Sequence, residues 1–155
     1  MNTRLLITLL CTGAIAFACG PRSHTEASTT TTSRVKQRSR HNGELAPTLL
    51  VHPARDRVEF ALDVVNRGEK RMELSFPSGQ AYDFVVLDSV GRRLWQWSEG
   101  RMFTQAYQNK VIGGGDTLHL REQWQATLAP GRYTVVATLL STDHPMEQRL
   151  AFDVQ

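Results

Sequence analysis

Cysteine is almost absent from this chain of 155 residues, which contains only two. Cys11 lies inside an apolar N-terminal run that we expect to be removed, so Cys19 would be the one thiol left. A chain with a single thiol forms no internal disulfide and offers no cysteine-based metal site. The fold must therefore depend on its hydrophobic core alone.

Long apolar runs are also absent. The N-terminal run, residues 5–17, is shorter than the roughly 20 residues that a transmembrane helix needs. With Arg4 before it and small residues after it, the run predicts a signal peptide over residues 1–18. Residues 16–18, Ala-Phe-Ala, form a site for ordinary signal peptidase, whereas Cys19 directly after them is typical of a lipoprotein. We therefore expect export, with a membrane anchor through a lipid on Cys19 or else a secreted or periplasmic chain.

The predicted domain has no excess of basic charge, although the whole chain has a net charge of +3. Residues 20–57 hold seven basic against three acidic side chains, whereas residues 58–155 hold ten basic against twelve acidic ones. A nucleic-acid-binding domain carries its positive charge on the domain itself, so this distribution excludes that class of protein. Residues 19–46 are polar and threonine-rich, which predicts a disordered linker. The folded domain is expected over residues 47–155.

Helical periodicity is lacking too, because apolar residues alternate with polar ones at a period of two after residue 57. Seven or eight short strands at a spacing of roughly ten residues predict an all-β, immunoglobulin-like antiparallel β-sandwich. A partly closed barrel is the alternative, since spacing alone does not separate the two. Asp88 to Gly91 has the composition of a type I hairpin turn, and residues 129–131 supply a Pro-Gly turn. The strands are expected near residues 58–64, 72–76, 82–87, 93–98, 118–124, 133–139 and 150–154.

Patterns that carry catalysis or bind metal are scarce. None of the five histidines has another at the i, i+2 or i, i+4 spacing that would direct two of them at one ion. Ser78, Asp83 and His119 are the residue types of a hydrolytic triad, but Ser78 lies in Pro-Ser-Gly-Gln rather than in a G-x-S-x-G elbow. A glycine run at residues 113–115 is followed by Asp116 instead of the lysine of a phosphate loop. We therefore expect no enzymatic activity, no metal and no cofactor.

Trp95 and Trp97 lie two residues apart in a predicted strand, which places both rings on one face. Such a pair either packs in the core, where aromatic rings bury large areas, or forms an exposed platform for a sugar or a peptide. We favour packing in the core or in an interface.

The segment Phe76–Gln105 combines turn glycines and aromatic residues in one tight order. The set as a whole resembles the intracellular proteinase inhibitor BsuPI family, and the resemblance extends over about Val58 to Val154. It implies an immunoglobulin-like sandwich and a link to the inhibition of serine proteases. The residues that carry it are Phe76, Ser78-Gly79-Gln80, Tyr82-Asp83-Phe84, Gly91, Trp95-Gln96-Trp97-Ser98, Gly100 and Phe103-Thr104-Gln105, with Trp124 and Pro130-Gly131-Arg132-Tyr133 further on.

The leading functional prediction is a non-catalytic, exported binding module that inhibits a serine protease in the cell envelope by blocking its cleft. The alternative is an envelope adaptor or assembly module without a protease target, which would use a sheet edge or the aromatic face. A substrate-like inhibitor needs a rigid exposed loop, and this chain has no disulfide to stiffen one. The expected contact residues lie in two loops beside turns: Ser78, Gly79 and Gln80 in the first, and Met102, Phe103, Thr104 and Gln105 in the second.

Overall fold

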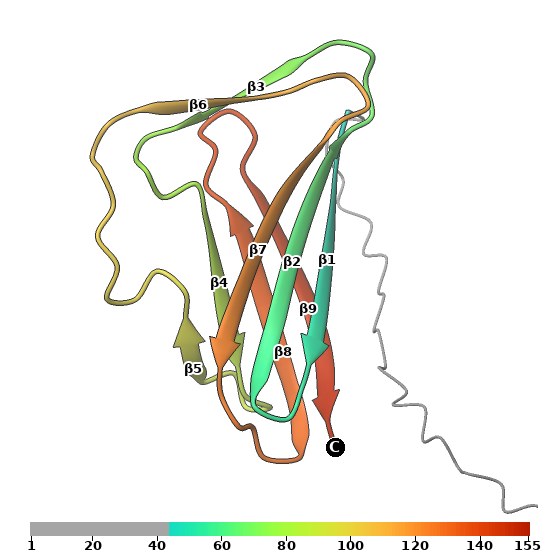
Figure 1. The fold of residues 1–155 in the computed structure, drawn as a ribbon, viewed down its shortest axis with the longest axis vertical. Coiled ribbons are helices and arrows are strands. Elements are labelled where there is room, and N and C mark those ends of the chain that lie inside the picture. Colours follow the sequence, from blue (N-terminus) through green and yellow to red (C-terminus); the bar gives the residue numbers. More distant parts are fainter. Residues whose placement is uncertain (1–43) are drawn as a thin grey trace, which may run out of the picture.

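The computed structural model describes residues 44–155, which fold into strands joined by turns and loops (Figure 1). All the strand pairs are antiparallel. The prediction of an all-β antiparallel sandwich is therefore confirmed, with nine strands in place of the seven or eight expected. The strands are β1 (Leu45–Pro53), β2 (Arg57–Asn66), β3 (Met72–Phe76), β4 (Tyr82–Leu87), β5 (Arg93–Gln96), β6 (Gln108–Ile112), β7 (Thr117–Gln125), β8 (Gly131–Leu139) and β9 (Met146–Val154).

Two sheets form the layers of the sandwich, one with the order β1-β2-β7 and the other with the order β5-β4-β8-β9 (Figure 1). The edge strands β1 and β9 lie next to each other and bring the two layers together along one side. A third sheet, the two-stranded ribbon β3-β6, crosses one end of the sandwich (Figure 1). The immunoglobulin-like assignment stays a prediction.

The core lies between the two layers and is built from the alternate positions of their strands. The ring of Phe60 stacks on Phe84 and on Trp95, with centroid distances of 5.7 Å and 5.4 Å. Trp95 stacks in turn on Trp124 at 5.5 Å, and Trp97 is buried, so the interpretation of both tryptophans as core residues is confirmed. Each large apolar side chain that is fully buried stabilises the folded state by roughly 1.5–3 kcal/mol. Other core residues include Leu62, Val64, Val86, Val135, Ala137, Leu139, Leu150 and Phe152.

Two strands, β1 and β6, lie outside the predicted set. β1 begins at Leu45, two residues before the predicted start of the domain, and it contains Pro47 and Pro53. Proline has no N–H for a sheet ladder and is confined to edge strands, the position that β1 occupies. β6 is short and mostly polar, so it gives little alternation to detect. β5 ends at Gln96, whereas the sequence predicted a strand as far as Ser98.

The predicted signal peptide, the lipidation residue Cys19 and residues 20–43 of the predicted linker lie outside the described part of the chain. Within residues 44–155, the structure has no helix long and apolar enough to cross a membrane.

Asn66 links the two turns at the end of the sandwich where β3 and β6 lie, and its side chain is fully buried. Its Nδ2 group donates to the carbonyl oxygens of Lys70, Ile112 and Gly113 at 2.8, 3.1 and 3.0 Å. Its Oδ1 atom accepts the backbone N–H of Gly68 at 3.0 Å. One buried amide thus satisfies groups from both turns, which holds the β3-β6 ribbon to β2.

Candidate functional site

The segment between β5 and β6, residues 97–107, contains no strand and runs along one side of the sandwich as a long connection (Figure 1). We refer to it as the 97–107 loop. Most of its side chains are exposed, Met102 to 99% and Tyr107 to 80%. The loop includes the four predicted contact residues from Met102 to Gln105.

Asp83 fixes the start of the 97–107 loop. This residue lies in β4 and is buried. Its Oδ1 atom accepts the backbone N–H groups of Phe84 and Ser98 at 2.9 and 3.1 Å. Its Oδ2 atom accepts the side-chain amide of Gln96 at 2.6 Å and the hydroxyl of Ser98 at 2.7 Å. A carboxylate with four donors around it binds the end of β5 and the first residues of the loop to β4.

Trp97 provides a second anchor in the same region. Its ring stacks on Tyr82 with a centroid distance of 4.5 Å and packs on Phe103 at 5.5 Å. Arg101 turns back onto the same residue, because its Nε donates to the Trp97 carbonyl at 2.8 Å and its guanidinium carbon lies 4.6 Å from the ring centroid. The residues on either side of Met102 therefore both contact Trp97, while Met102 itself points into solvent.

The structure brings the two predicted loops together. The backbone N–H of Gly79 donates to the carbonyl of Thr104 at 2.9 Å. A Cβ atom at position 79 would lie 2.7 Å from Thr104 Oγ1, so the close approach of the two segments requires glycine there. The Ser78 hydroxyl accepts the N–H of Gln80 at 3.2 Å and shapes the turn. Residues 78–80 are half-buried and lie against the 97–107 loop as its support.

The residue types considered for a hydrolytic triad have other partners. The Asp83 carboxylate is occupied by the start of the loop, and His119 Nδ1 lies 2.7 Å from Asp63 Oδ1. Arg121 NH1 lies 2.7 Å from that same oxygen. Partial burial opposes ionisation of Asp63, but the hydrogen bonds from Arg121 and His119 outweigh it and lower its pKa. Within residues 44–155, no three His, Cys, Asp or Glu side chains are grouped so that they could bind a metal ion.

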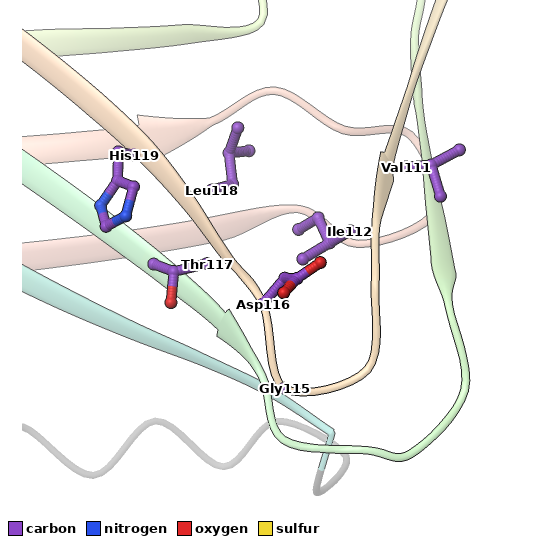
Figure 2. Close-up of a pocket in the computed structure, with 7 residues that line it drawn as sticks. All are labelled: Val111, Ile112, Gly115, Asp116, Thr117, Leu118 and His119. Atoms are coloured by element: carbon purple, nitrogen blue, oxygen red, sulfur yellow. The ribbon is translucent and has the colours of Figure 1, made fainter.

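An open hollow of about 480 Å³ lies between the end of β6 and the start of β7. Figure 2 shows the side chains that line it. Ile112 and Leu118 form its apolar part, and Asp116 and His119 contribute polar atoms. The hollow shares no lining residue with the 97–107 loop, so it is separate from the candidate contact residues.

Sequence reasoning identified the exposed residues of the loop but missed the groups that hold it in place, which are Asp83, Trp97 and Arg101. The signal that could have identified Asp83 is a lone carboxylate inside the otherwise apolar strand Tyr82–Leu87. A buried carboxylate needs donors around it, so its position predicts a hydrogen-bond network even where the donors are unknown.

Comparison with known proteins gives one family. The family described as "BsuPI: Intracellular proteinase inhibitor" matches residues 45–144, a range that includes the whole 97–107 loop. No curated protein matches the chain. The match agrees with the resemblance carried by the segment Phe76–Gln105 and extends it to β1.

Several solved structures are similar at low identity. The yjhA protein from Bacillus subtilis is 14% identical, with a TM-score of 0.40 over 78% of this chain and 96% of that one. A β-glucosidase from Kluyveromyces marxianus is 15% identical, with a TM-score of 0.38 over 68% of this chain and 13% of that one. β-Glucosidase 3B from Thermotoga neapolitana is 12% identical, with a TM-score of 0.40 over 80% of this chain and 16% of that one. This chain spans less than a fifth of either glucosidase, and at these TM-scores the similarities support no functional conclusion.

The family match overturns the predicted location of the chain. The N-terminal sequence predicted an exported protein, lipid-anchored through Cys19 or else secreted or periplasmic. The matching family is described as intracellular, and this description contradicts export. The prediction is wrong because an apolar run after a single arginine is a short and unspecific pattern, whereas the family match covers residues 45–144.

Proposed function

The chain belongs to the BsuPI family of intracellular proteinase inhibitors, and we propose that it inhibits a serine proteinase by inserting the 97–107 loop into the active-site cleft. The family makes a proteinase the natural partner. The position of the loop supports this role. Most of its side chains are exposed, while hydrogen bonds to the Asp83 carboxylate and to the Trp97 carbonyl hold the loop at several points.

The observation that carries this proposal is the Asp83 network. Binding orders flexible segments at a cost of roughly 0.5–1.5 kcal/mol for each immobilised side chain, and a loop that is fixed before binding avoids most of that cost. Small inhibitors often fix their loops with disulfides, which the residues of this domain do not include. Three hydrogen bonds from Gln96 and Ser98 to one buried carboxylate perform the same task here.

The proposed contact residues divide into two groups. Met102, Thr104 and Gln105 are exposed and would touch the proteinase. Residues 78–80 would act indirectly, because Gly79 holds the Thr104 carbonyl. Phe103 would also act indirectly, because its ring packs on Trp97. Of the seven predicted contact residues, three would thus touch the proteinase and four would hold those three in place.

An inhibition assay with the full chain tests this proposal. Purified protein is titrated against serine proteinases with trypsin-like, chymotrypsin-like and subtilisin-like specificity, with a cysteine proteinase and a metalloproteinase as class controls. We expect competitive inhibition of at least one serine proteinase with a dissociation constant of about 10⁻⁶ M or lower, as for other interfaces of standard size. The two control enzymes should stay active. Full activity of every serine proteinase at ten times that concentration would refute the proposal.

A further inference from the structure

Met102 is exposed to 99%, more than any other large apolar side chain of residues 44–155. We infer that Met102 is the side chain that enters the primary specificity pocket of the proteinase, and that this pocket is apolar. The inference rests on the proposed function and adds the class of enzyme, namely serine proteinases that select unbranched apolar residues. Exposure alone does not support it, because single apolar residues are common on protein surfaces. The arrangement of the neighbouring residues does.

Arg101 is exposed, but its side chain is engaged with Trp97. Its Nε donates to the Trp97 carbonyl at 2.8 Å, and its guanidinium lies over the Trp97 ring at 4.6 Å from the centroid. A trypsin-like pocket binds arginine or lysine through a carboxylate at its base. Arg101 would have to give up both contacts with Trp97 to reach such a carboxylate, a cost that insertion of Met102 does not have.

Phe103 is engaged in the same way. Its ring packs on Trp97 at 5.5 Å and is partly buried against the core. The sequence Arg-Met-Phe contains a cation and an aromatic ring that different proteinases would select, but both of these side chains contact Trp97. Met102, exposed to 99%, is the one of the three whose side chain would give up no such contact on entering a pocket.

The backbone on both sides of Met102 is tied down. Before it, the N–H and hydroxyl of Ser98 bind Asp83, and after it the Thr104 carbonyl accepts the N–H of Gly79. Methionine is unbranched and adaptable, so it fits a narrow apolar slot without strain. Tyr107 is also exposed, but both of its neighbours, Ala106 and Gln108, are exposed as well. Met102 differs because both of its neighbours, Arg101 and Phe103, are engaged with the Trp97 ring.

The test is a change of specificity in the full chain. Met102→Lys is expected to weaken inhibition of a proteinase with an apolar pocket at least about 30-fold, the loss that corresponds to removing an interface hot spot. The same variant is expected to inhibit a trypsin-like enzyme at least about 30-fold better than the wild type does. Val90→Lys is the matched control, since Val90 is 75% exposed in the turn between β4 and β5. It should change neither inhibition constant by more than about threefold.

The outcomes separate this inference from the proposed function. If the wild type inhibits an apolar-pocket enzyme and both Met102→Lys and Met102→Gly inhibit it equally well, Met102 is not the specificity residue, although the chain is still an inhibitor. If the wild type inhibits the trypsin-like enzyme best, the inferred enzyme class is wrong. If it inhibits no serine proteinase at all, the proposed function fails and this inference fails with it.

Discussion

Asp83→Asn is expected to weaken proteinase inhibition at least about 30-fold while the sandwich stays folded. The amide that replaces Oδ2 meets the side-chain amide of Gln96 and the hydroxyl of Ser98, two groups that donate to the wild-type carboxylate. Hydrogen bonds to a charged group contribute about 1.5–3 kcal/mol each. We therefore expect the free energy of unfolding to fall by about 2–4 kcal/mol. The loop would no longer be fixed in the free protein, so binding would have to order it.

The measurement is the inhibition constant of the variant together with its urea unfolding curve. Asp88→Asn is the control, because the Asp88 carboxylate also accepts backbone N–H groups, those of Val90 and Arg92, but in a turn outside the loop. It should lower stability without changing the inhibition constant. Wild-type inhibition by Asp83→Asn would mean that the buried carboxylate does not order the 97–107 loop.

Asn66→Ala is expected to lower the free energy of unfolding by about 3–5 kcal/mol. The substitution leaves the carbonyls of Lys70, Ile112 and Gly113 and the N–H of Gly68 without the buried amide that satisfies them. Each buried polar group that loses its partner costs about 1–3 kcal/mol, and some of the four groups recover a bond to water. Equilibrium unfolding in urea at neutral pH measures the change.

Asn109→Ala controls for the loss of an asparagine near the same ribbon. Asn109 lies in β6 and is exposed, and its Nδ2 donates to Glu73 Oε1 at 2.7 Å. Removing this exposed bond should cost no more than about 1 kcal/mol. If Asn66→Ala costs as little as the control, the two turns are not held by the buried amide. Since Asn66 lies outside the 97–107 loop, its folded variant should keep the wild-type inhibition constant.

The strands that the sequence predicts well are those with one face in the core. β2 and β8 alternate apolar and polar residues because one face of each packs against the opposite layer. β9 was predicted only over residues 150–154, because the buried Gln148 interrupts the alternation in its first half. The hairpin turn after β4 was predictable from its own residues, and the Gly91 N–H donates to the Asp88 carbonyl at 3.1 Å. β1 was not predictable in this way, because its two prolines are tolerated only through its edge position, which depends on the whole sheet.

In the candidate site too, local sequence predicts some of the residues, whereas the pairing of distant strands decides the others. Exposed residues beside turns, such as Met102, could be proposed from local sequence. The partners of Asp83 could not, since they depend on the pairing of β4 with β5 and on a register shift between Val86 and Leu87. The return of Arg101 onto Trp97 likewise depends on Gly100, whose φ of 74° is strained for other residues.

Hydrogen exchange of the full chain, alone and with the serine proteinase that it inhibits, is the most direct measurement of whether the 97–107 loop makes the contact. The backbone amides of residues 101–107 are expected to exchange more slowly in the complex. The turn at residues 88–92 should exchange at the same rate in both states. Unchanged exchange in the loop, with protection confined to another surface such as the open edge of β7, would contradict the role assigned to the loop.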